Sequence, residues 1–263
     1  MDRVFVWPPN ENLDIPANYV GVMIEKRPDG GFHTGVLYCT SQRGAHVLHL
    51  LGHLGGTQRR RFINENPQPS QLCVLCNVDP VEIRALARVF REIYNKNSNS
   101  GLPYGFTSSA SQWFDDDKLL VQVPLGDGLC CQTFVLAAFQ AANMPLIDPA
   151  EAPTRIDDYE LQREFFDNII RVAIQNAKPK TQEHFAVVET KLGAAIYRPL
   201  EVVGAAKSDA LPCSFAEAQA NGNDLEPLIP PTVILGMAAE VATADTAVAL
   251  ADATPGGSGV MPD

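Results

Sequence analysis

Residues 19–51, YVGVMIEKRPDGGFHTGVLYCTSQRGAHVLHLL, decide the fold. They contain three segments typical of β-strands, at 19–26, 32–40 and 45–51, which the turn sequences RPDGG and SQRG separate. Strands joined by such short turns pair antiparallel to their neighbours. This stretch therefore predicts a three-stranded meander within an antiparallel sheet.

The sequence that follows the meander adds a further strand and several helices. LCVLCNV, residues 72–78, is typical of a buried strand, and Asp79 with Pro80 and Glu82 forms the start signal of a helix. Amphipathic helices are predicted at 128–144 and 157–175, and a closing pair of strands at 184–190 and 194–200. The fold class that follows is α+β, with an antiparallel sheet packed on helices.

Acidic charge is concentrated near the C-terminal end of the chain. The formal net charge is −11, and residues 201–263 contain nine acidic residues against one base, Lys207. Fourteen alanines and several prolines accompany this charge. We therefore expect a folded domain over 1–200 and a low-complexity acidic tail, serving as a linker or docking segment, over 201–263.

Composition and charge also exclude some partners and compartments. An acidic protein with a pI near 4.9 is a poor partner for nucleic acid or an anionic membrane. No stretch has the apolar length of a membrane helix, and the first residues, MDRVFVWPPNENLD, lack the apolar core of a secretory signal. We expect a protein that is cytoplasmic as synthesised, with export only through a dedicated secretion machine.

Six cysteines are spread along the chain, and we expect reduced thiols with no metal and no cofactor. Cys73 and Cys76, together with His49 and His53, have the number and type of ligands of a zinc site. On a strand, however, residues three apart point to opposite faces, which a shared metal does not tolerate. Core cysteines are the preferred interpretation, and a zinc-stabilised interaction domain is an alternative.

The segment PLGDGLCCQTFVLAAF, residues 124–139, carries the strongest signal for chemistry. A glycine-containing break precedes a cysteine at the start of a predicted helix, where free N–H groups and the helix dipole favour thiolate over thiol. We predict that Cys131 is a nucleophile and keep Cys130 as the alternative thiol. The competing interpretation is a small buried residue that packs the start of the helix.

A thiol nucleophile needs an imidazole, and three of the five histidines lie on the predicted meander. If its second and third strands pair with an even sum of residue numbers, His33 and His49 share a face, roughly 5–8 Å apart. An odd sum instead places His46 beside His33. Gly35, on the face of His33, is expected to leave room for a substrate or a helix end. His184, far along the chain, is not expected to join the site.

The order of these motifs resembles that of the circularly permuted NlpC-type papain-like cysteine hydrolases, which include the lecithin retinol acyltransferase-like enzymes. HTGVLYCTSQRGAHVLHL, residues 33–50, is similar to their pattern of a histidine, an apolar strand, a turn and a Val-x-His-Leu strand. CQTFVLAAF, residues 131–139, is similar to their Cys-x-x-Phe-Val helix start. The resemblance covers residues 20–144 and implies a permuted papain-like fold with Cys131 as nucleophile, His33 as base and His49 as the residue that orients the base.

Two further residues are candidates for stabilising an oxyanion. Tyr104, in GLPYGF, resembles the tyrosine of a Pro-Tyr segment that some NlpC-type members place before the nucleophile, which implies a part in oxyanion binding. Gln122, nine residues before Cys131, has a side-chain amide that can donate to an oxyanion. The basic run RRRF, residues 59–62, is expected to be a solvated loop, with contact to an acidic group of the substrate as the alternative. The acidic run 115–117 is also expected to be a solvated loop.

These candidates predict a cysteine hydrolase that cleaves an amide or peptide bond through a thioester acyl-enzyme. The resemblance favours bacterial cell-wall peptide as substrate, and the absence of a secretory signal fits a delivered toxin or effector with an immunity or delivery protein as partner. The alternatives are a lipid acyl hydrolase or acyltransferase, a protein deamidase, and a non-enzymatic binding module with core cysteines.

Overall fold

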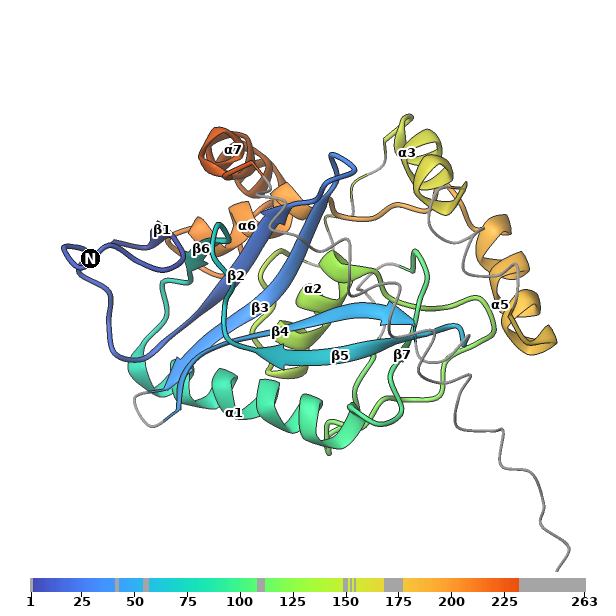
Figure 1. Cartoon of the computed structure of the whole chain (residues 1–263), viewed down its shortest axis with the longest axis horizontal. Helices are drawn as coiled ribbons and strands as arrows, with labels where there is room; N and C mark the ends of the chain where they lie inside the picture. The colour runs from blue at the N-terminus through green and yellow to red at the C-terminus, as the bar shows by residue number, and fades with distance from the viewer. Residues whose placement is uncertain are drawn as a thin grey trace, which may run out of the picture. The chain divides into compact units, whose positions relative to one another are not determined.

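The computed structural model describes residues 2–40, 43–53, 57–107, 112–148, 151, 153, 155–167 and 177–231. They form an α+β fold around a seven-stranded sheet with the order β1-β6-β2-β3-β4-β5-β7, in which all neighbours are antiparallel (Figure 1). Its strands are β1 (Val4–Val6), β2 (Tyr19–Lys26), β3 (Phe32–Thr40), β4 (Gly44–His53), β5 (Arg59–Glu65), β6 (Leu72–Leu75) and β7 (Leu102–Pro103). The helices are α1 (Pro80–Asn97), α2 (Cys131–Ala141), α3 (Asp158–Phe165), α5 (Pro179–Thr190), α6 (Pro199–Lys207) and α7 (Phe215–Leu225), followed by the short 3-10 helix η2 (Glu226–Leu228).

The predicted meander is confirmed as β2, β3 and β4 at the middle of the sheet. Val36 of β3 faces Leu48 of β4, and Thr40 faces Gly44, so the pairing has an even sum of residue numbers. Thr40 and Gly44 are the last pair before the connection, which has three residues, 41–43. This length sets the register of the two strands.

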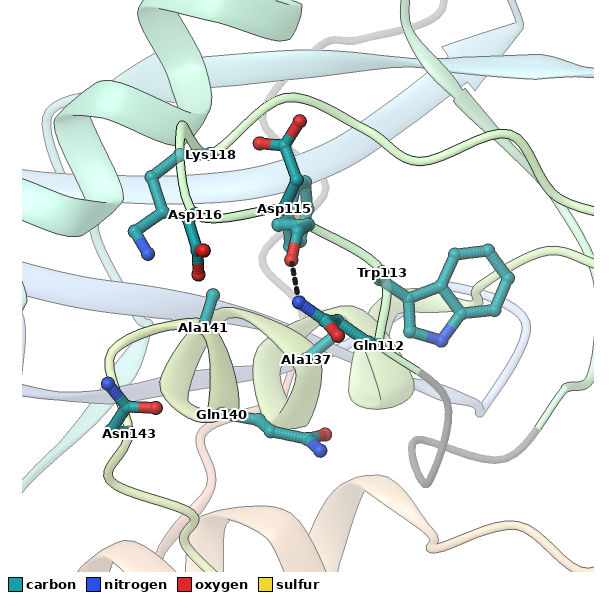
Figure 2. Close-up of a pocket in the computed structure, with 10 residues that line it drawn as sticks. Gln112, Trp113, Asp115, Asp116, Lys118, Ala137, Gln140, Ala141 and Asn143 are labelled. Carbon is teal, nitrogen blue, oxygen red and sulfur yellow. Dashed lines mark hydrogen bonds between the residues drawn. The ribbon is translucent and has the colours of Figure 1, made fainter.

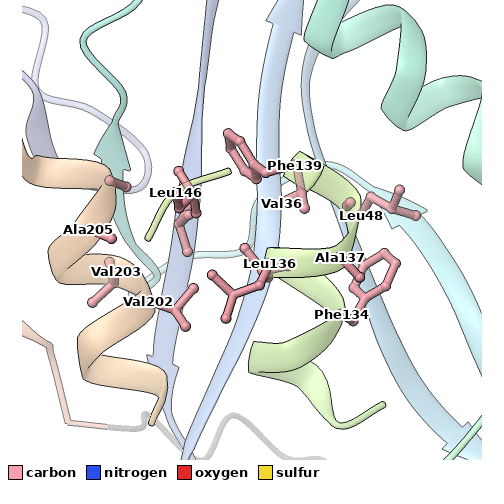
Figure 3. Close-up of a cluster of buried hydrophobic side chains, with 14 of the residues drawn as sticks. Val36, Leu48, Phe134, Leu136, Ala137, Phe139, Leu146, Val202, Val203 and Ala205 are labelled. Atoms are coloured by element: carbon pink, nitrogen blue, oxygen red, sulfur yellow. The ribbon is translucent and has the colours of Figure 1, made fainter. Parts of the chain in front are cut away.

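Apolar residues bury both faces of the sheet, but different segments cover them. Residues of α1, α2 and α6 pack on the face that carries Val36 and Leu48, as the side chains between α2 and α6 show (Figure 3). The opposite face carries Leu37 and Val47, and the N-terminal segment packs there through Trp7, Leu13 and Ile15. The sheet therefore presents one helix-covered face and one face covered by irregular chain.

The start signal at Asp79 is confirmed at the first turn of α1. The Asp79 carboxylate accepts hydrogen bonds from the N–H groups of Val81 and Glu82, at 2.7 and 2.9 Å, and the Glu82 carboxylate accepts from the N–H of Asp79 at 2.9 Å. This reciprocal cap satisfies donors that a helix start otherwise leaves to water. The predicted apolar spacing is buried, at Ile83, Leu86, Phe90 and Ile93.

Two predictions of local structure were wrong, and a third is tested only in part. The run RRRF lies in strand β5, between β4 and β7, and not in a solvated loop. Residues 184–190 belong to helix α5, whose buried residues Thr181, His184, Phe185 and Val188 have helical spacing, and 194–200 form no strand. The helix predicted at 157–175 is confirmed over α3 and the helical residues 166 and 167 that follow it, and residues 168–175 lie outside the described residues.

The folded unit extends beyond the predicted boundary at residue 200, to Pro231. Val202, Val203, Ala205 and Ala206 of α6 are fully buried in the main core. A Cβ added at Gly204 would lie 2.1 Å from the carbonyl oxygen of Ala218, so small residues are what lets α6 and α7 approach. The alanine-rich composition that suggested a tail thus serves close helix packing up to this point, and residues 232–263 lie outside the described residues.

No helix within the described parts of the chain is both long enough and apolar enough to cross a bilayer.

Candidate active site

The even register brings His33 and His49 together on one face of the sheet. His33 Nε2 lies 2.8 Å from His49 Nδ1, and both side chains are buried. A Cβ at Gly35 would lie 2.9 Å from the Cβ of His49 and 2.7 Å from Cγ1 of Val47. The space that glycine leaves is therefore filled by these two side chains and not by a substrate or a helix end, which corrects that expectation.

Glu65 decides how the two imidazoles share their protons. Its Oε1 lies 3.3 Å from His49 Nε2, on the side of the ring away from His33. A carboxylate attracts an N–H and repels a lone pair, so it favours the tautomer with hydrogen on His49 Nε2. His49 Nδ1 then accepts from the Nε2–H of His33, and the free lone pair of His33 is on Nδ1.

Both imidazoles are neutral at pH 7, because burial lowers the pKa of each. The charges of Arg27 and Arg60 lower the pKa of His33 further, and Glu25 opposes them. His33 also lowers the pKa of His49, against the attraction of Glu65. A neutral His33 with a free Nδ1 lone pair is able to accept a proton.

Cys131 is the first residue of α2 and is only partly buried, whereas Cys130 is buried. Cys130 packs with Tyr104 and Phe106, and burial raises the pKa of its thiol to about 12. The Cys131 thiol donates to the side-chain oxygen of Gln132 at 3.1 Å. Of the two adjacent thiols, Cys131 is the one that a reagent can reach.

Arg60 and Tyr104 lie beside the start of α2. The guanidinium of Arg60 stacks over the Tyr104 ring, 4.6 Å from its centroid. Burial lowers the pKa of Arg60, and negative charge on Tyr104, Cys131 or Cys130 would raise it. Burial also holds the pKa of Tyr104 well above its usual value, which keeps the phenol protonated. Arg60 was not among the predicted site residues, because three consecutive arginines suggested solvent exposure.

His184 fixes the loop that leads to Cys131. Its Nδ1 accepts from the N–H of Gly126 at 3.2 Å, so its Nε2–H donates to the carbonyl oxygen of Tyr104 at 2.8 Å. The imidazole of His184 on α5 thereby joins the backbone of Tyr104 to that of Gly126, in the loop that precedes α2. The sequence offered a signal for this role only in the helical spacing of its buried neighbours.

The predicted residues form two groups that no hydrogen bond joins within the described chain. His33 and His49 lie with Glu65 on the sheet face of Leu37 and Val47, whereas α2 packs on the opposite face. Cys131 lies with Tyr104 and Arg60. The electrostatic effect of Arg60 on His33 links the two groups.

The remaining predicted residues lie apart from both groups. Gln122 is exposed on the loop before α2, and no described interaction ties it to Cys131. His46 points to the opposite face from His49 and stacks on Tyr38, with ring centroids 5.6 Å apart. Cys73 and Cys76 lie in two different apolar clusters, on opposite faces as the strand period predicts. Among the described residues, no group of three or more His, Cys, Asp or Glu side chains is placed to hold a metal ion.

A polar cavity of about 260 Å³ lies further along α2 (Figure 2). Gln140, Asn143, Asp116 and Lys118 line it, so part of the acidic run borders a hollow and is not simply solvated. Gln140 is nine residues after Cys131, a separation of about 13 Å along a helix axis. The cavity contains none of the predicted catalytic residues.

Comparison with known proteins gave no match to a family model, a curated protein or a solved structure.

Proposed function

We propose that the chain is a thiol-dependent hydrolase of the permuted papain-like type, which cleaves an amide or peptide bond with Cys131 as nucleophile. One observation carries the proposal: the partly exposed thiol of Cys131 begins an 11-residue helix, and the preceding residue, Cys130, packs with the Tyr104 ring that lies under the guanidinium of Arg60. A helix N-terminus and a nearby cation are the surroundings in which proteins stabilise negative charge on sulfur.

In this mechanism the Cys131 sulfur attacks the carbonyl carbon, and its proton passes to Nδ1 of His33. The phenol of Tyr104 donates to the oxyanion, and His49 orients His33. His33 then protonates the leaving amine, a thioester acyl-enzyme remains, and water releases the acid. Cys131 and His33 share no hydrogen bond, and α2 packs on the sheet face opposite His33, so the proposal requires a substrate-induced rearrangement that brings the thiol and the imidazole within reach of one water molecule.

The substrate class rests on the order of the motifs. We propose peptides of the bacterial cell wall as substrate, and delivery to a target cell with an immunity or delivery protein as partner. Lipid acyl transfer and protein deamidation use the same thiol and imidazole and are the other reactions to screen.

A specific observation favours one second candidate, a non-enzymatic binding module. His33 and His49 hydrogen-bond to one another on the face opposite α2, as structural histidines do, and no hydrogen bond joins them to the thiol within the described chain. In that case Cys131 is a packing residue at a helix start.

Alkylation by iodoacetamide between about pH 5 and pH 9, mapped to each cysteine by mass spectrometry, separates the two candidates. We expect Cys131 to react at least about tenfold faster than Cys130 at neutral pH, and His33→Gln to change the pH profile of Cys131. Cys131→Ala should lower hydrolysis of cell-wall peptides about a thousandfold or more, while Cys130→Ala, the matched control, retains it. If all six thiols react slowly, with pH midpoints of about 8.5, the binding module is the function that remains.

A further inference from the structure

Arg60 is a partly buried cation that has no acidic partner among the described residues. Its Nε is enclosed and has no hydrogen-bond partner, and the described residues give it no ion pair. The contrast is Arg155, also partly buried, whose guanidinium donates two hydrogen bonds of 2.9 Å to the carboxylate of Glu201. A charge that is withdrawn from water without a counter-charge raises the free energy of the folded protein, and a bound anion would lower it.

The surroundings of Arg60 are arranged to receive that anion. The ring of Tyr104 supports one face of the guanidinium, which leaves its N–H edge as the polar surface. Arg27 acts on Arg60 as a second positive charge. The first N–H groups of α2, beside Cys131, have no partner within the helix and add to the positive potential.

We propose that Arg60 binds a carboxylate of the substrate, so that the site selects acyl groups or peptides with an anionic group next to the bond that Cys131 attacks. This inference rests on the proposed function and names its substrate class. A planar guanidinium fork matches the two oxygens of a carboxylate, and a charge-assisted pair of this kind is strong where water is excluded.

Two alkylating reagents that differ in charge test the proposal at Cys131 itself. Iodoacetate carries a carboxylate where iodoacetamide carries a neutral amide, and both transfer a group of similar size. The quantity to measure is the ratio of their rate constants at Cys131, normalised to the same ratio for N-acetylcysteine amide. We expect a normalised ratio above one that falls at least fivefold in Arg60→Gln.

Arg61→Gln is the matched control, because Arg61 is the next residue of β5 and is exposed, and its substitution removes the same charge. It should leave the ratio within a factor of two of the parent, and Arg60→Lys should give an intermediate ratio because the charge stays and the fork is lost. Equal ratios in the parent and in Arg60→Gln, or equal losses in Arg60→Gln and Arg61→Gln, would overturn the proposal.

Calorimetric titration with glutarate gives a readout that does not depend on thiol reactivity. The proteins to titrate are the Cys131→Ala variant and the two double variants that also carry Arg61→Gln or Arg60→Gln. The anion site is supported if glutarate binds to Cys131→Ala and to the Arg61→Gln double variant but not to the Arg60→Gln double variant. It is contradicted if glutarate binds to none of the three, or binds equally with and without Arg60. An inert Cys131 combined with Arg60-dependent glutarate binding would refute the hydrolase and keep the anion site. A reactive Cys131 with no effect of Arg60 would do the reverse.

Discussion

Gly35 sets the distance between the two strands' side chains at the imidazole pair. In Gly35→Ala the new Cβ would lie 2.7 Å from Val47 Cγ1 and 2.9 Å from the Cβ of His49, so β4 or its side chains must shift. We expect a loss of about 1–3 kcal/mol in the free energy of unfolding, measured by urea denaturation. Gly31→Ala in the exposed turn is the control and should change it by less than about 0.5 kcal/mol. Equal effects of the two substitutions would contradict this account.

The candidate site could be predicted from the sequence only in part, for reasons that lie in single residues. The choice between Cys130 and Cys131 depends on burial, which tertiary contacts with Tyr104 decide. The choice between His46 and His49 depends on strand register, and both parities are compatible with the local pattern until the turn length is known. Arg60 could not be singled out among three arginines, because its burial comes from the neighbouring chain and not from its own strand.

At the scale of the element, the cap of α1 makes a measurable contribution. Asp79→Ala removes the acceptor of two N–H groups, and we expect a loss of about 1 kcal/mol in the free energy of unfolding. Asp79→Ser restores an acceptor at the same position and should recover most of the loss. Thermal or urea unfolding of the three proteins checks this, and an alanine variant as stable as the parent would show that the cap is dispensable.

The elements with strong local patterns were predicted nearly where the structure has them, whereas β5 and α5 were not. The strands β2 and β3 and the helices α1 and α2 carry their own alternation, turns or start signals. Strand β5 has three arginines in succession and is held by pairing with β4, which a local pattern does not contain. In α5 the β-branched residues Val187 and Val188 suggested a strand, whereas burial follows a period of three to four residues.

At the scale of the whole molecule, α6 and α7 are part of the folded unit. A chain that ends at residue 200 loses the fully buried Val202, Val203, Ala205 and Ala206 and exposes the sheet surface beneath them. We expect that truncation to abolish cooperative unfolding, and truncation after Pro231 to retain it. Circular dichroism during thermal unfolding of both proteins is the measurement. A stable, cooperative product from the shorter chain would restore the boundary at residue 200.

Acid should destabilise the whole fold through the buried imidazoles. In the native state His33 and His49 have pKa values lowered to about 4 from an ordinary value of 6.5, so the unfolded chain binds more protons as the pH falls. Their contribution to stability is complete above pH 6.5 and is lost between pH 6.5 and about 4, on the order of 3 kcal/mol for each imidazole. Urea midpoints measured across that range should fall steeply in the parent and less steeply when His33→Gln and His49→Gln are combined. Parallel slopes would assign the acid sensitivity to other groups.

The row of His33, His49 and Glu65 has a direction, with a hydrogen bond of 2.8 Å between the imidazoles and an ion-pair contact of 3.3 Å from His49 to Glu65. At one end is the unprotonated Nδ1 of His33, and at the other is a carboxylate whose side chain is 42% exposed. A proton that arrives at His33 Nδ1 can displace the shared proton toward His49 and release another to Glu65, as in a Grotthuss relay. Both rings are then neutral again, but each carries its hydrogen on its other nitrogen, so the imidazole pair has two states of equal charge. The two states differ in which nitrogen of each ring carries the hydrogen, and the reverse proton transfer restores the first state.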